Sequence, residues 1–261
     1  MDIRIVTSTN EDLTYLDFWK LQSLSNKVFF PKFKLCIAFL TNRNYDDSLI
    51  KEMVDNGIEV KIYTPLNYVP EPNLSKIIRY LYASEFESDI CTVTDMDTIP
   101  LQSDYLNKVL SHVEKDKILS VGKEVLINTP DSGKFPAHHT SGFGNMFKKL
   151  YNPNNLEFEE CVKSLIGINI FHNRENITNS PKDFSDESLN RALIFKNKID
   201  VKDITRDINI YEDWVDRSWW NLNVEKLNSG KYIEANLLRP LKDNYDKIKP
   251  IEQYILKCQK N

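Results

Sequence analysis

Short apolar runs alternate with longer amphipathic stretches through the first part of the chain. The apolar runs are rich in β-branched and aromatic residues, which is typical of strands, and they cover residues 3–9, 34–41, 58–65 and 89–94. The stretches between them carry apolar residues at helical spacing and predict helices over residues 11–28, 46–57 and 72–86. Such an alternation favours an α/β fold with a doubly wound, mostly parallel sheet.

The second part of the chain is less regular. We expect helices over residues 101–115, 155–167 and 185–196, strands over 118–127 and 168–173, and a glycine-containing loop over 134–147. The sequence shows neither an internal repeat nor a clear linker. We therefore predict a single domain over residues 1–261 with two lobes, 1–100 and 101–261.

The fourth predicted strand is followed by Asp95-Met96-Asp97. Alternate side chains of a strand share a face, so Asp95 and Asp97 should point the same way. Two carboxylates this close repel each other, and the pKa of one of them rises unless a cation lies between them. Ligands of doubly wound sheets bind beyond the carboxyl ends of the strands, where this pair and the hydroxyls of Thr7 and Ser8 are placed. The position favours a metal site over a solvated turn.

Charge and composition narrow the class of protein further. The net charge of −4 and the pI of about 5.7 argue against a general nucleic-acid binder, but not against a small phosphorylated ligand. No apolar run approaches the roughly 20 residues of a transmembrane helix, and the first residues resemble a strand more than a signal peptide. The four cysteines lack CxxC spacing, and Cys36 and Cys91 lie in apolar runs. We expect a soluble, cytoplasmic protein with buried free thiols.

The segment over residues 76–100, KIIRYLYASEFESDICTVTDMDTIP, carries a family resemblance. It is similar to the helix–strand–motif unit of nucleotide-sugar-dependent glycosyltransferases with the GT-A fold. In these enzymes a basic residue in a helix precedes an apolar strand and then Asp-x-Asp. The resemblance continues in outline through the glycine-containing loop, an Asp-Glu pair at the head of a late helix, and the segment EANLLRP. It implies a GT-A-like, Rossmann-like fold with a nucleotide-binding lobe over 1–100 and an acceptor-binding lobe over 101–261.

The same resemblance implies an activity. The enzyme would move a sugar from a nucleoside diphosphate sugar, with UDP-sugars favoured, to a hydroxyl of a glycan or glycoprotein acceptor. Mn²⁺ or Mg²⁺ would stabilise the charge of the departing diphosphate. Its ligands would be Asp95, Asp97 and Asn236, where Asn236 stands in place of a His that many such enzymes have. Neither a nucleic-acid partner nor a membrane span is implied.

The resemblance also assigns the other candidate residues to three groups. Residues that would contact the nucleotide sugar are Thr7, Ser8, Lys76, Arg79, Asp95, Met96, Lys231 and Arg239. Residues that would contact the acceptor are His138, His139 and Gly142. The catalytic carboxylates would be Asp186, our first choice as the base, and Glu187.

Two alternatives to a transferase stay open. Haloacid-dehalogenase-type phosphatases also place Asp-x-Asp at a strand end, with the first Asp as the nucleophile. Here the motif follows the fourth predicted strand rather than the first, and Ile99 stands where that family expects Thr or Val. The second alternative is a GT-A-fold binding protein that has lost its activity, because Asn236 is a weaker ligand than His for Mn²⁺.

Overall fold

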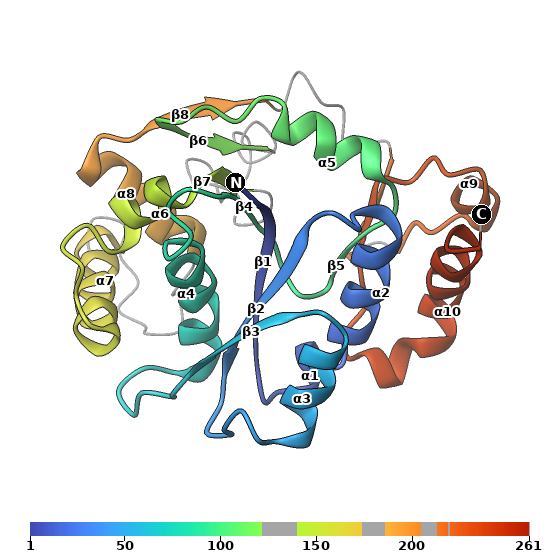
Figure 1. Ribbon diagram of the computed structural model, residues 1–261, viewed down its shortest axis with the longest axis horizontal. Coiled ribbons are helices and arrows are strands. Elements are labelled where there is room, and N and C mark those ends of the chain that lie inside the picture. The colour runs from blue at the N-terminus through green and yellow to red at the C-terminus, as the bar shows by residue number, and fades with distance from the viewer. Residues whose placement is uncertain (122–139, 174–185, 205–212, 219, 261) are drawn as a thin grey trace.

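The computed structural model describes residues 1–121, 140–173, 186–204, 213–218 and 220–260 (Figure 1). The first part of the chain alternates strands and helices as predicted. The strands are β1 (Ile3–Asn10), β2 (Lys34–Leu40), β3 (Glu59–Tyr63) and β4 (Ile90–Val93), and the helices are α1 (Leu13–Leu16), α2 (Trp19–Phe29), α3 (Ser48–Asp55) and α4 (Glu71–Ala83). The predicted helix over 11–28 is therefore two helices, and Asp12 caps the first by accepting a hydrogen bond from the backbone N–H of Thr14 at 2.8 Å.

The main sheet has the strand order β3-β2-β1-β4-β7-β6-β8. The first four strands in this order pair in parallel, so their carboxyl ends meet at one edge. β7 (Thr140–Phe143) runs antiparallel to both β4 and β6 (Lys117–Ser120), and β8 (Asp200–Asp203) pairs in parallel with β6. These pairings confirm the predicted α/β class with a mostly parallel sheet.

Two apolar cores cover the two faces of this sheet. Ile5 and Leu35 belong to one core, whereas their neighbours Val6 and Cys36 belong to the other, because successive strand residues point to opposite faces. One core is formed with α4, α6 (Gly144–Tyr151), α7 (Phe158–Asn173) and α8 (Asp186–Asn197), which lie together on the left of Figure 1. The other is formed with α2, α3, α5 (Ser103–Leu110) and the C-terminal α10 (Leu241–Cys258).

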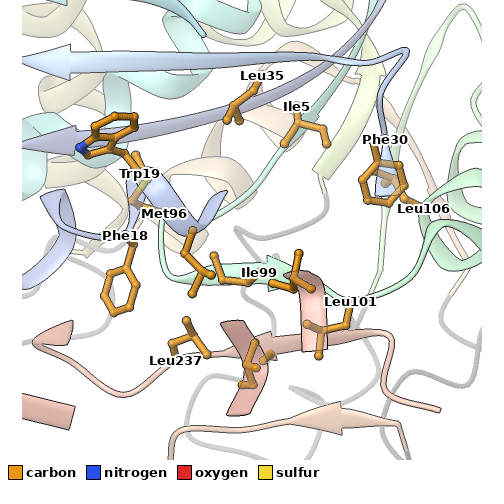
Figure 2. Packing of buried hydrophobic residues seen from close by; sticks show 14 of the residues in the cluster. Ile5, Phe18, Trp19, Phe30, Leu35, Met96, Ile99, Leu101, Leu106 and Leu237 are labelled. Carbon is orange, nitrogen blue, oxygen red and sulfur yellow. The ribbon is translucent and has the colours of Figure 1, made fainter. Parts of the chain in front are cut away.

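A small second sheet connects the C-terminal segment to the end of β4. It has the order β5-β10-β9, with β5 (Thr98–Pro100), β10 (Glu234–Asn236) and β9 (Trp214–Val215), and α9 (Val224–Asn228) follows β9. Figure 2 shows Ile99 of β5 between Met96 and Leu101, with Leu237 nearby. All four side chains are buried in the core that contains α2. Apolar packing therefore places the residues after β9 and β10 beside the Asp95–Asp97 turn.

Several predicted elements of the second part are wrong. Residues 168–173 are not a strand but the last part of α7, because the helix continues through Gly167 and β propensity alone is weak. Residues 140–147 of the predicted loop are β7 and the start of α6. Gly142 therefore lies inside β7, opposite Cys91 of β4. The predicted strand over 118–127 is β6 as far as Ser120, and residues 122–127 lie outside the described part.

Two predictions from composition can be compared with the structure. Cys36 and Cys91 are buried free cysteines, as expected, and burial raises the pKa of the Cys36 thiol to about 12. Among the described helices, none combines the length and the apolar character needed to cross a membrane.

Candidate active site

A cavity of about 270 Å³ lies at the carboxyl ends of β1 and β4. This is the edge of the parallel sheet at which ligands of α/β folds bind. Both carboxylates and basic side chains line it, so it is suited to a polar, charged ligand. The lining residues are Ser8, Asn10, Asp12, Tyr15, Pro72, Ser75, Lys76, Arg79, Asp95, Met96, Asp97, Asp186, Glu187, Arg217 and Arg239.

The Asp95–Asp97 turn is held in place by a buried glutamine of α2. Gln22 donates from Nε2 to three backbone carbonyls, those of Asp95 at 3.2 Å, Met96 at 3.1 Å and Thr98 at 2.7 Å. The Met96 side chain is buried in the apolar core beside Trp19 (Figure 2). The turn is therefore anchored by both a polar and an apolar contact, and Asp95 and Asp97 are left to face the cavity.

Arg79 of α4 joins the turn to the head of α8. Arg79 is 3% exposed, and its guanidinium donates to the carbonyl of Thr94 at 3.0 Å, to Oδ1 of Asp95 and to Oδ2 of Asp186. Burial alone would lower the pKa of Arg79, but the two carboxylates raise it well above its usual range. We predicted that Arg79 contacts the diphosphate. The structure places Arg79 at the cavity wall, with its guanidinium already paired to carboxylates.

Asp97 is the most deeply buried acid of the cavity, with 1% of its side chain exposed. Its Oδ2 accepts a hydrogen bond from Arg217 Nη1, and Arg239 Nε lies 3.2 Å from the same oxygen. Burial and the neighbouring charge of Asp95 raise the pKa of Asp97 to about 7, although the charge of Arg217 opposes this. Arg217 also donates to Oδ1 of Asn236 at 2.9 Å. The structure thus brings Asp97 and Asn236 together, as the predicted metal site requires.

The two candidate catalytic carboxylates differ in their access to the cavity. Asp186 is 3% exposed and is held by Arg79. Burial raises the pKa of Asp186, and the charge of Arg79 opposes this rise. Glu187, the next residue of α8, lines the same cavity and is half-buried. Glu187 is therefore better placed than Asp186 to reach a ligand, whereas we had preferred Asp186 as the base.

Of the other predicted donor contacts, some line the cavity and some do not. Ser8, Lys76 and Arg239 line it. Arg239 also donates to the Tyr15 hydroxyl, and its guanidinium carbon lies 4.5 Å from the centre of the Tyr15 ring. Burial lowers the pKa of Arg239. Thr7 is fully buried in β1 rather than in the cavity wall.

The remaining predictions fall outside this cavity. Lys231 is exposed and precedes β10, whereas Asn236 is at the end of that strand beside the cavity. Gly142 is buried in β7 and is not among the residues of the cavity wall, because it belongs to the sheet. The predicted acceptor contacts His138 and His139 lie outside the described residues. Neither Lys231 nor Gly142 therefore has a contact that supports its predicted role.

The cavity and the adjoining Asn236 offer oxygen ligands of the kind that Mn²⁺ and Mg²⁺ prefer. These are the carboxylates of Asp95 and Asp97 and the amide oxygen of Asn236. The buried Oδ1 of Asp97 has no hydrogen-bond partner among the described residues, which is the situation of an oxygen that a cation could satisfy. Within the described ranges, no cluster of three or more His, Cys, Asp and Glu residues could hold a metal ion. The predicted site therefore depends on the amide of Asn236 as well as the two carboxylates.

Sequence reasoning missed several residues of the site. Asn10 and Tyr15 line the cavity near Ser8, and Asn10 could have been found because it lies two residues beyond Ser8 on the same face of β1. Gln22 could not be distinguished from other polar residues of a helix. Arg217 could not be placed because its position depends on β9, a two-residue strand that, among the described residues, pairs with β10.

The chain was compared with protein-family models, curated proteins and solved structures. A scan against protein-family models and a search of curated proteins found no match to this chain. Among solved structures, the chain resembles the bifunctional glycosyltransferase WbbM in its apo form, with a TM-score of 0.50, 11% identity, and coverage of 100% of this chain and 52% of WbbM. It also resembles the galactosyltransferase LgtC in complex with donor and acceptor sugar analogues, with a TM-score of 0.50, 11% identity, and coverage of 99% and 95%.

A third neighbour is the glycosyltransferase GlyE of Streptococcus pneumoniae TIGR4, with a TM-score of 0.50, 11% identity, and coverage of 98% of this chain and 64% of GlyE. The chain thus spans about half the length of WbbM and nearly all of LgtC. The fold is that of the GT-A glycosyltransferases, which confirms the predicted fold class. At this level of identity the likeness shows the fold and leaves the activity to be argued from the site.

Proposed function

We propose that this protein is a glycosyltransferase that takes its sugar from a nucleoside diphosphate sugar. One observation carries the proposal. In a GT-A fold, the cavity beyond β1 and β4 is lined by Asp95, Asp97 and Glu187, and the buried Arg79 joins Asp95 to Asp186, the residue before Glu187. This arrangement provides acids for a cation and a carboxylate for the sugar at the edge where the fold binds ligands.

The donor would occupy the cavity with its nucleoside near β1. Ser8 and Asn10 offer hydrogen-bonding groups there, and a UDP-sugar is the favoured donor. Lys76 and Arg239 supply positive charge for the diphosphate. Asp95, Asp97 and Asn236 would hold Mn²⁺ or Mg²⁺, which when bound supplies Lewis-acid stabilisation of the departing diphosphate. The buried Gln22 would keep Asp95 and Asp97 in position for this.

In the transfer, the bond between the anomeric carbon and the diphosphate oxygen breaks, and a bond from that carbon to the acceptor hydroxyl oxygen forms. The acceptor loses its proton to a base, and the developing positive charge on the sugar ring needs a nearby carboxylate. We assign to Glu187 the role of the carboxylate that lies near this positive charge on the sugar ring. Asp186 would act through Arg79, because this buried pair fixes the head of α8 against α4. The acceptor would be a hydroxyl of a glycan or glycoprotein.

Calorimetric titration with UDP, GDP, CDP and dTDP, with and without Mn²⁺, tests the donor site. We expect one nucleotide to bind with Mn²⁺ and to lose at least about tenfold in affinity in Asp97→Asn, since each 1.4 kcal/mol is a factor of ten. Asp104→Asn is the matched control, because Asp104 is exposed on α5 and lies outside the cavity wall. No binding by any of the four nucleotides would overturn the proposal.

The two alternatives make different predictions for turnover. A binding protein without activity would bind the nucleotide but would not cleave a nucleotide sugar. A phosphatase would release phosphate from simple monoesters and would lose this activity in Asp95→Asn. The GT-A fold supports the transferase over the phosphatase.

A further inference from the structure

We propose that the guanidinium of Arg217 and a divalent ion compete for the same two oxygens, Oδ2 of Asp97 and Oδ1 of Asn236. Arg217 would therefore set how tightly the site binds metal. The inference rests on the proposed function only in taking these residues as metal ligands. The observation behind it is the pair of hydrogen bonds that Arg217 donates to these oxygens.

Both oxygens converge on a single atom. Arg217 Nη1 donates to Oδ1 of Asn236 at 2.9 Å and also to Oδ2 of Asp97. Oxygens that converge on one point are the arrangement that a hard cation requires of its ligands. The positive nitrogen of Arg217 thus lies between two of the three residues assigned to the metal.

The small three-stranded sheet explains why Asp97, Asn236 and Arg217 meet. Asn236 at the end of β10 pairs with Thr98 of β5, so Asp97 is next to the following residue, and the N–H of Leu237 donates to the carbonyl of Asp97 at 2.9 Å. β9 pairs in parallel with the other edge of β10, and Arg217 follows two residues after its end. Three adjacent strands therefore deliver one residue each to the same place.

The two cations cannot occupy this place together. A divalent ion would have to lie about 2.1 Å from each oxygen, where it would meet Nη1 and be repelled by its charge. Arg217 is the partner with room to move, because 31% of its side chain is exposed against 1% of that of Asp97. An ion held by these two oxygens would therefore displace the Arg217 guanidinium, and the free energy of that displacement would be lost from metal affinity. An ion bound to Asp97 through the unpartnered Oδ1 alone would leave Arg217 in place, and Arg217→Gln would then not change the affinity.

The test is Mn²⁺ binding without any nucleotide, measured by the electron paramagnetic resonance signal of free Mn²⁺. We expect Arg217→Gln to bind Mn²⁺ about tenfold more tightly than the unsubstituted protein, because a competing cation is removed. Arg217→Lys keeps the positive charge and should stay close to the unsubstituted protein. Arg43→Gln is the matched control: Arg43 is also paired with two acids, Glu11 and Asp47, and lies outside the cavity wall.

Equal or weaker Mn²⁺ binding by Arg217→Gln than by the unsubstituted protein would overturn the inference, and so would tighter binding by Arg43→Gln to the same extent. Circular dichroism of each variant establishes that it is folded, and Arg217→Lys provides a second comparison if Arg217→Gln is not. A parallel titration with UDP, GDP, CDP and dTDP keeps the two proposals apart. Failure of all four nucleotides to bind contradicts the donor site, whereas the Mn²⁺ titration alone decides the role of Arg217.

Discussion

At the scale of single residues, the site is a set of paired charges, of which Arg79, Asp97 and Asp186 are buried. Asp95 and Asp186 share Arg79, and Asp97 is paired with Arg217 and Arg239. The sequence predicted the acids, because Asp-x-Asp at a strand end is a local pattern. It could not predict their partner Arg217, which is brought to Asp97 by strand pairing rather than by sequence spacing.

Gln22 is a residue whose effect we expect to be specific. Gln22→Ala leaves three turn carbonyls without their donor, and it should lower the free energy of unfolding by about 1–3 kcal/mol and weaken nucleotide binding. Asn197→Ala is the control. Asn197 Nδ2 also donates to backbone carbonyls, two of them, but Asn197 is the last residue of α8, at the end opposite to Asp186 and the cavity. The control should lose stability without losing nucleotide affinity. Urea unfolding and calorimetry measure the two effects, and unchanged nucleotide affinity in Gln22→Ala would contradict this role.

The raised pKa of Asp97 predicts a pH dependence of stability in metal-free protein. Between the usual carboxyl pKa of 3.8 and the folded-state pKa of about 7, the folded state binds the proton more tightly than the unfolded state does. The resulting stabilisation is complete below the unfolded-state pKa and is lost as the pH rises through the folded-state pKa. Urea unfolding in EDTA from pH 5 to 8 should therefore show a steeper loss of stability than in Asp97→Asn, by up to about 1.4 kcal/mol per pH unit. Equal slopes would show that the pKa of Asp97 is not raised.

At the scale of elements, the β–α alternation of the first part was predictable because each strand and helix carries its own periodicity. The short strands β5, β9 and β10 were not predictable, since they are stabilised by pairing between distant segments. The strand prediction for residues 168–173 was wrong because the run is β-branched but continues a helix. The loop prediction for residues 140–147 was wrong because it assumed that glycines indicate a turn, whereas the glycines there allow close packing of β7 and α6.

Gly144 shows such packing. A Cβ at this position would lie 2.1 Å from the carbonyl oxygen of Phe86 and 2.9 Å from that of Ala83, where the backbone cannot easily move. We expect Gly144→Ala to lower the free energy of unfolding by about 1–3 kcal/mol. In Gly167→Ala a Cβ meets nothing within 4 Å, and replacement of a helical glycine should raise stability by up to about 1 kcal/mol. Urea unfolding of both variants checks the contrast, and equal effects would contradict the packing of α6 against the end of α4.

At the scale of the whole molecule, the structure confirms the α/β class, and the mostly parallel main sheet is covered on both faces. The cavity at its edge is built from both halves of the chain, since Asp95 and Asp97 come from the first and Glu187, Arg217 and Arg239 from the second. The division into a nucleotide lobe over 1–100 and an acceptor lobe over 101–261 stays a prediction. A sequence pattern can indicate candidate residues in each half of the chain. The packing of α4 on α8 and the pairing of β5 with β10 bring the two groups of residues together.

The central claim is that this cavity transfers a sugar, and donor turnover tests it most directly. The measurement is release of nucleoside diphosphate from UDP-, GDP-, CDP- and dTDP-sugars with Mn²⁺, followed by ³¹P nuclear magnetic resonance. We predict release from one donor class, slowed at least about 100-fold in Glu187→Gln and unchanged in Glu160→Gln, which replaces an exposed acid of α7. Absence of release from every donor, or equal rates in Glu187→Gln and the unsubstituted protein, would contradict this claim.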